Sequence, residues 1–173
     1  MRVSFDLDGE ATTVDVAPDR SLRSVLRGEC DAKSVKNGCE SGRCGSCTVL
    51  IDGNAVKSCL LPAGKVGGRA VTTVEGIDPG TPGRDLQDAF EAEFALQCGY
   101  CTPGFLLSAA AYLDDDPDPD REAIRSAIEG NVCRCTGYGP IVDAVEAVAA
   151  DGAATDRDHH STTDEPPDRE ENP

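Results

Sequence analysis

Residues 37–47 read Asn37-Gly38-Cys39-Glu40-Ser41-Gly42-Arg43-Cys44-Gly45-Ser46-Cys47, three cysteines set among three glycines. The cysteine spacing is C-x4-C-x2-C, and a fourth cysteine follows after eleven further residues. The first three positions match the ligand spacing of plant-type [2Fe–2S] proteins. Such a cluster carries net negative charge, so its ligand loop must wrap closely around it, and glycines permit that backbone. The sequence therefore predicts one cluster held by Cys39, Cys44, Cys47 and Cys59.

A four-cysteine zinc site is the alternative for this set. Zinc sites usually take their ligands as two closely spaced cysteine pairs from separate turns. Here three candidate ligands crowd one glycine-rich loop and Cys59 stands apart. That distribution favours the iron–sulfur cluster over zinc.

The residues on both sides of the loop predict a small β-sheet domain over residues 1–76. Apolar and polar residues alternate in two runs divided by Gly9, which predicts a hairpin over residues 2–16. Asp52-Gly53 is a strong hairpin-turn signal. The other expected elements are a helix over 21–27 capped by Ser21, and strands over 48–51, 55–61 and 70–74.

The second half of the chain has helical periodicity. Residues 77–83 contain two prolines and two glycines and are predicted to be a linker. In residues 84–150 apolar positions recur every three to four residues, as in amphipathic helices. Residues 151–173 lose this periodicity and hold eight acidic residues, which predicts an acidic, disordered tail. The four expected helices, which suggest a bundle, cover residues 84–96, 103–113, 121–128 and 140–150.

A second cysteine set, C-x2-C and C-x-C, lies within the helical half. Pro103 and Pro140 open helices close to these cysteines, so two helix N-termini are expected to stabilise negative charge there. Residues two apart do not share a helix face, so the C-x-C pair is expected on a turn. Zinc is a stronger competitor here than at the first set. Beside that first set, we predict a second [2Fe–2S] cluster, held by Cys98, Cys101, Cys133 and Cys135.

Composition agrees with a protein held together by metal sites. Only 39% of the 173 residues are apolar and 4% are aromatic, so two small domains would be marginal by burial alone. In a reducing cytoplasm nine cysteines indicate metal rather than disulfides. Cys30 matches no ligand position and is interpreted as a packing or free thiol.

The net charge of −16 excludes binding to nucleic acid and to anionic membranes. The acidic residues are spread along the chain, and Lys is rare, with 4 Lys against 12 Arg. This distribution indicates a halophilic protein adapted to high salt. The start of the chain lacks a signal peptide, and no apolar run approaches the ~20 residues needed to cross a bilayer. We therefore expect a soluble, cytoplasmic protein without membrane insertion.

The two cysteine sets in this order resemble the iron–sulfur small subunit of the xanthine oxidase family of molybdenum hydroxylases. That family includes aldehyde oxidoreductases and aerobic carbon monoxide dehydrogenases. The resemblance covers roughly residues 1–150, and its motifs are residues 37–50, 58–60, 97–104 and 129–138. It implies an α+β fold, with an N-terminal β-grasp, ferredoxin-like [2Fe–2S] domain followed by a C-terminal four-helix [2Fe–2S]-binding domain.

The resemblance also implies partners and an electron route. A molybdopterin-binding large subunit oxidises the substrate, and electrons pass through the helical-domain cluster and the ferredoxin-domain cluster to FAD on a medium subunit. Gln97 is implied to hydrogen-bond the pterin, and Cys135 to lie against the pterin amino group. A free-standing two-cluster ferredoxin is the alternative, although a simple carrier needs no second domain.

The chain offers no catalytic residue of its own. It has no histidine outside the tail, so acid–base chemistry by histidine is not expected in its folded part. Substrate conversion by this oxidoreductase is therefore expected on the large subunit. Carbon monoxide, an aldehyde, a purine and other heterocycles all stay open as substrates.

Overall fold

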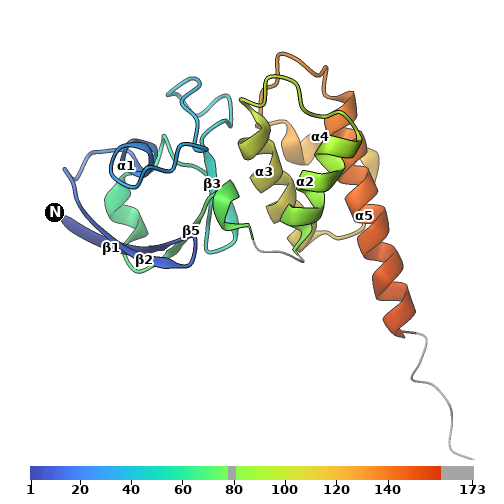
Figure 1. Ribbon diagram of the computed structural model, residues 1–173, viewed down its shortest axis with the longest axis horizontal. Helices are drawn as coiled ribbons and strands as arrows, with labels where there is room; N and C mark the ends of the chain where they lie inside the picture. The colour runs from blue at the N-terminus through green and yellow to red at the C-terminus, as the bar shows by residue number, and fades with distance from the viewer. Residues whose placement is uncertain (78–80, 161–173) are drawn as a thin grey trace, which may run out of the picture.

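The computed structural model describes residues 1–77 and 81–160, with side chains described up to residue 150. Two lobes lie side by side, a β-sheet lobe formed by the first half of the chain and a helical lobe formed by the second (Figure 1). The loops that carry the cysteines lie along the upper edge of both lobes in this view.

The first lobe is a five-stranded mixed sheet in the order β2-β1-β5-β3-β4. β1 pairs antiparallel with β2 and parallel with β5, while β3 pairs antiparallel with both β4 and β5. This topology, with α1 packed on the sheet, is that of a β-grasp domain and confirms the predicted class. The strands are β1 (Arg2–Leu7), β2 (Glu10–Asp15), β3 (Thr48–Ile51), β4 (Asn54–Lys57) and β5 (Ala70–Thr72).

The helix α1 (Leu22–Gly28) begins where the sequence predicts. The Ser21 hydroxyl accepts a hydrogen bond from the backbone N–H of Ser24, which satisfies one of the free donors of the first turn. Leu22, Val25 and Leu26 are fully buried and join the inward side chains of the sheet in one core. Two short 3-10 helices, η1 (Ala63–Val66) and η2 (Val74–Gly76), complete the lobe.

The second lobe contains the four predicted helices. They pack around a core of fully buried side chains that includes Phe90, Phe105 and Ile124. α4 is capped by Asp120, whose carboxylate accepts from the N–H of Ala123 at 2.8 Å. The helices are α2 (Pro82–Ala92), α3 (Thr102–Asp115), α4 (Arg121–Ile128) and α5 (Gly139–His160).

Several predicted boundaries are wrong. The strand expected over residues 70–74 ends at Thr72, because Val74 opens η2. α2 starts two residues earlier than expected and ends at Ala92, not at residue 96, because Phe94 takes a positive φ of 53° and stops the helix. The strand expected over residues 55–61 ends at Lys57, where the chain turns toward the Cys39–Cys47 loop.

The last helix is longer than predicted. α5 runs to His160, so the disorder predicted from residue 151 is wrong for residues 151–160, and residues 161–173 lie outside the described part. The helix is carried into this stretch by alanines, which cluster over residues 144–154 and have the highest helix propensity. The last turns of α5 extend beyond the other helices (Figure 1). Turns beyond the packed bundle need no apolar residues at helical spacing, so periodicity does not reveal them.

Candidate metal centres

The loop of residues 37–47 concentrates backbone donors on one sulfur. The N–H groups of Ser41, Arg43 and Cys44 point at the Sγ of Cys39 over 3.5, 3.3 and 3.3 Å. These donors favour the thiolate, and chiefly the bond from Ser41 lowers the pKa of Cys39 to about 6. The loop therefore stabilises negative charge at the site before any metal is considered.

The first four cysteines come together as two pairs. Cys39 and Cys44 hydrogen-bond to each other on the loop. Cys47 is buried just before β3, and its side chain hydrogen-bonds with that of Cys59, which follows β4. Burial, with this bond, raises the pKa of Cys59 to about 11. The hairpin β3–β4 thus brings the sequence-distant fourth cysteine to the loop, as predicted.

Gly38 and Gly42 in this loop have no room for a side chain. A Cβ at Gly38 would lie 2.6 Å from the Sγ of Cys44, and one at Gly42 would collide with the side chain of Leu60. Gly42 also has a positive φ of 74°. The close wrapping that the sequence predicts for these two glycines is therefore present.

The second four cysteines also form two pairs. The Sγ atoms of Cys98 and Cys135 lie 3.6 Å apart, and Cys101 hydrogen-bonds with Cys133. Burial, with that bond, raises the pKa of Cys101 to about 12. Each pair joins the loop between α2 and α3 to the loop between α4 and α5. All eight predicted ligands are thus brought together in two sets.

The sulfur of Cys133 has its own donors. The N–H groups of Cys135 and Thr136 point at it over 3.4 and 3.5 Å, and the Thr136 hydroxyl donates over 3.2 Å. Burial alone would raise the pKa of Cys133, but these hydrogen bonds outweigh it and the pKa falls. Within the described residues, no three His, Cys, Asp or Glu side chains gather as a single-ion site. The cysteines stand in pairs.

The environment of the second set differs in part from the prediction. Cys133 and Cys135 lie on a turn ahead of α5, as expected. Pro103 lies in the first turn of α3, which begins at Thr102, and Cys101 takes the cap position. Cys98, Cys135 and Gln97 are exposed. Cys30, the ninth cysteine, is half-buried against the core of the first lobe, as the packing interpretation requires.

The two cysteine regions touch each other through Asn131, which sequence reasoning did not single out. Its side chain, 4% exposed, donates to the carbonyl oxygen of Gly45 at 3.3 Å and accepts from the Ser108 hydroxyl at 3.0 Å. The N–H of Val132 donates to the carbonyl of Cys44 at 2.9 Å. In the sequence Asn131 stood out only as a polar residue beside Gly130 within the motif of residues 129–138.

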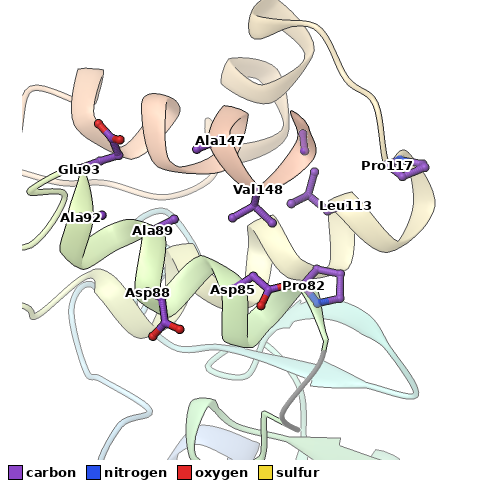
Figure 2. Close-up of a pocket in the computed structure, with 11 residues that line it drawn as sticks. Pro82, Asp85, Asp88, Ala89, Ala92, Glu93, Leu113, Pro117, Ala147 and Val148 are labelled. Atoms are coloured by element: carbon purple, nitrogen blue, oxygen red, sulfur yellow. The ribbon is translucent and has the colours of Figure 1, made fainter. Parts of the chain in front are cut away.

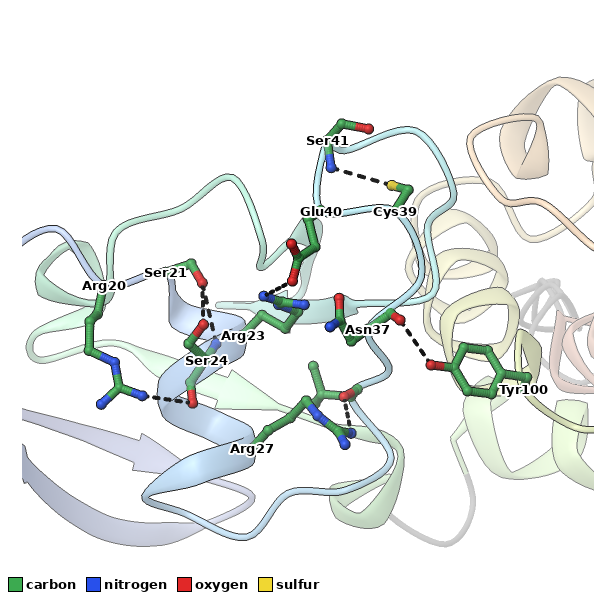
Figure 3. A network of polar contacts seen from close by, with 11 residues as sticks. Arg20, Ser21, Arg23, Ser24, Arg27, Asn37, Cys39, Glu40, Ser41 and Tyr100 are labelled. Atoms are coloured by element: carbon green, nitrogen blue, oxygen red, sulfur yellow. Dashed lines mark hydrogen bonds and ion pairs between the residues drawn. The ribbon is translucent and has the colours of Figure 1, made fainter.

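A second bridge joins the lobes at the ligand loop. The hydroxyl of Tyr100 donates to the carbonyl of Asn37 at 2.9 Å (Figure 3). On the other side of the loop, Arg23 of α1 pairs with Glu40 at 3.0 Å. The loop of residues 37–47 is therefore held between α1 and the helical lobe.

A separate groove lies elsewhere on the helical lobe. It has a volume of about 530 Å³ and is bordered by α2, the end of α3 and α5 (Figure 2). Leu113 and Val148 line its floor, and Asp85, Asp88 and Glu93 add carboxylates. No cysteine is among the described residues that line it, so it is separate from the metal centres.

Comparison with known proteins agrees with this geometry. Residues 5–69 match the family model of the 2Fe-2S iron-sulfur cluster binding domain, and residues 73–146 match that of the [2Fe-2S] binding domain. The fold and the paired cysteines thus define an iron–sulfur protein with two [2Fe–2S]-binding domains. No helix in the described part of the chain is long and apolar enough to span a membrane.

Three relatives illustrate the similarity. The nicotine 6-hydroxylase small subunit of Paenarthrobacter nicotinovorans is 44% identical over 84% of this chain and 87% of its own length. A chain of quinoline 2-oxidoreductase from Pseudomonas putida 86 superposes with a TM-score of 0.82 at 42% identity, covering 89% of this chain and 96% of that chain. The aldehyde oxidoreductase of Megalodesulfovibrio gigas is 40% identical over 83% of this chain, which covers 16% of that protein.

This chain belongs to the iron–sulfur subunits of the molybdenum hydroxylase family, as the resemblance predicted. It is an oxidoreductase subunit, and the site that converts the substrate lies on another chain. The homologous small subunits imply a molybdopterin-binding large subunit as its partner.

Proposed function

We propose that this chain is the electron-transfer subunit of a molybdenum hydroxylase, with one [2Fe–2S] cluster held by each set of four cysteines. The observation that carries the proposal is the pairing of Cys39 with Cys44, Cys47 with Cys59, Cys98 with Cys135 and Cys101 with Cys133. Two irons that share four thiolates take two each, so two pairs per set suit a dinuclear cluster.

The surroundings of the cysteines also suit a negatively charged cluster. Backbone N–H groups point at the sulfurs of Cys39 and Cys133 in the two sets. Such donors stabilise thiolates and raise the potential of a bound cluster. A bound [2Fe–2S] cluster supplies one-electron transfer, while this chain sets its position, its exposure and its hydrogen bonds.

The arrangement supports a direction for the electrons. The second set presents Cys98 and Cys135 at the surface, where a molybdopterin-binding large subunit can approach, and Gln97 is exposed beside them. We propose that Gln97 and Cys135 contact the pterin. Electrons then pass through the Val132–Cys44 contact to the first set and onward to FAD on a medium subunit.

The alternative of a free-standing ferredoxin is less well supported. Relatives that are 42–44% identical are named as subunits of dehydrogenases and hydroxylases. A carrier that works alone also has no need for a second cluster domain joined to the first by buried hydrogen bonds. Substrate choice belongs to the large subunit, so the names of the relatives assign no substrate to this chain.

The test is low-temperature EPR of the dithionite-reduced full chain, with iron measured on the same sample. Two distinct S = 1/2 signals with about four irons per chain are expected for two [2Fe–2S] clusters. Cys44→Ser should remove one signal and Cys133→Ser the other, each with loss of about two irons. A colourless, EPR-silent protein that binds zinc after expression with iron supplied would refute the proposal.

A further inference from the structure

We propose that Phe94 is the anchor through which the helical lobe binds the molybdopterin-binding large subunit, an inference that rests on the function proposed above. Phe94 is 81% exposed, more than any other large apolar side chain in the described part of the chain. Isolated exposed apolar residues are common on proteins and need no explanation. The backbone of Phe94 is what makes this one different.

Phe94 ends α2 in a conformation that favours glycine. Its N–H donates to the carbonyl of Glu91, and the N–H of Ala95 donates to that of Phe90, the bond pattern of a Schellman motif. The residue between them must then be left-handed, and Phe94 has a φ of 53°. Glycine usually takes this place because it has no Cβ, and a bulky residue there is an outlier.

The same motif explains why the ring faces outward. Ala95 and Phe90 are 3% and 1% exposed and make the inward apolar contact of the motif. With that contact made, the ring of Phe94 projects into solvent. Both the backbone and the side chain of Phe94 are thus unfavourable in the chain alone.

The other non-glycine residues with positive φ have a local reason for it. The structure has six such residues in its described part. Apart from Phe94, the side chain of each makes a polar contact within the chain. Asp8 and Tyr138 accept hydrogen bonds from the N–H groups of Thr73 and Cys133. The other three form ion pairs, Asp31 with Lys33, Glu40 with Arg23 and Asp52 with Arg69. Phe94 is the member of this described group whose side chain gains nothing inside the chain.

The position of Phe94 identifies the partner. Leu96, 42% exposed, and Cys98 follow on the same loop, and the Cys98 sulfur lies 3.6 Å from that of Cys135. An electron donor must approach these exposed cysteines closely. In the aldehyde oxidoreductase of Megalodesulfovibrio gigas the matching module is 16% of one long chain, so there the rest of the enzyme is attached covalently. A separate small subunit needs a surface anchor, and buried aromatic residues are the usual ones.

The test measures two effects of opposite sign. Phe94→Gly removes the strained backbone and the exposed ring, so the free chain should unfold about 2–4 °C higher. The same substitution should weaken binding to the molybdopterin-binding subunit, isolated from the native complex, by about 30-fold or more. Both are measured on the full chain with its iron content checked, by thermal unfolding and by biolayer interferometry.

Two control variants separate the causes. Asp31→Gly relaxes another left-handed residue, φ 58°, outside the proposed surface, and should leave the Kd unchanged within about 2-fold. Phe94→Tyr keeps the ring and should keep the affinity. If Phe94→Gly binds the large subunit as tightly as the native chain, or instead loses iron or stability, the anchor role is wrong.

Failure of the anchor role of Phe94 can be told apart from failure of the proposed electron-transfer function. Two EPR signals with an unchanged Kd for Phe94→Gly would overturn the anchor and leave the electron-transfer role in place. Weakened binding to the FAD subunit, with the large-subunit Kd unchanged, would overturn the assignment of the partner.

Discussion

The backbone N–H of Val132 donates a 2.9 Å hydrogen bond to the carbonyl oxygen of Cys44. Val132 precedes Cys133 in the second set, and Cys44 belongs to the first. One hydrogen bond therefore joins a cysteine of the first set to the residue that precedes a cysteine of the second. Any change that separates these loops should slow electron transfer between the clusters that we propose.

Asn131→Ala is expected to weaken this junction. The substitution removes the bonds to Gly45 and Ser108 and leaves the part-buried Ser108 hydroxyl without its acceptor. Loss of a buried hydrogen-bonded group costs about 1–3 kcal/mol, a fall in Tm of roughly 2–10 °C for a chain of this size. Stopped-flow reduction should show a slower second phase.

Ser108→Ala is the control, because it removes only one of the hydrogen bonds of Asn131 and should lower the Tm by less. Equal Tm values for Asn131→Ala and the native chain would contradict the role of Asn131 in joining the two lobes.

Gly104→Ala should disturb the same contact by steric means. A Cβ at Gly104 would collide with the carbonyl oxygen of Gly45 and lie 3.0 Å from the Nδ2 of Asn131. The colliding atom is backbone, so the lobes must shift, at a cost of about 1–3 kcal/mol by analogy with overpacked cores. Gly139→Ala is the control, because its Cβ would meet nothing within 4 Å. Thermal unfolding of the two variants compares them, and similar Tm values would contradict the close packing.

Asp8→Asn should raise the stability of the chain at neutral pH. The Asp8 carboxylate accepts from the N–H and hydroxyl of Thr73, but burial, with Glu75 and Asp6 adding repulsion, raises its pKa. A raised pKa means that the folded chain favours the protonated form of Asp8. The stability that Asp8 contributes is therefore fully present below its pKa in the unfolded chain, and it is lost as the pH rises through its pKa in the folded chain. Asparagine mimics the protonated form and tolerates the positive φ of Asp8.

The gain from Asp8→Asn should therefore be largest near pH 7 and shrink as the pH falls below ~4, the unfolded pKa of aspartate. Tm values measured from pH 3.5 to 7.5 provide the test. Asp19→Asn makes the same change of charge on an exposed residue and serves as the control. A pH-independent difference, or a loss of stability at pH 7, would show that the Thr73 bonds outweigh burial.

Salt should stabilise the chain. The net charge of −16 makes the folded state repel itself, and the Debye length falls from about 10 Å at 0.1 M to 3 Å at 1 M salt. We expect the Tm to rise by several degrees between 0.1 M and 2 M KCl. A variant with neutral residues in place of exposed carboxylates, Asp114→Asn with Asp115→Asn and Asp118→Asn, should respond less. A flat Tm would refute the interpretation of the composition as halophilic.

Much of the fold follows from local patterns. The alternation of residues 2–16, the Ser21 cap and the turn at Asp52-Gly53 each depend on neighbours in the chain, and each prediction is confirmed. The errors lie where tertiary packing or a single backbone conformation decides. Phe94 ends α2 early, and α5 continues to His160 through residues 151–160, which show no apolar period.

The sequence by itself determined the two [2Fe–2S]-binding domains, their order and the family, because ligand spacing and motif residues are properties of short stretches of chain. Only the tertiary structure decided how the cysteines pair within each set and which of them face outward. Cys98 and Cys135 are 37 residues apart, and Asn131 lies 86 residues from Gly45. Such contacts depend on how the lobes pack, and the exposure of Phe94 on a left-handed backbone depends on how one helix ends.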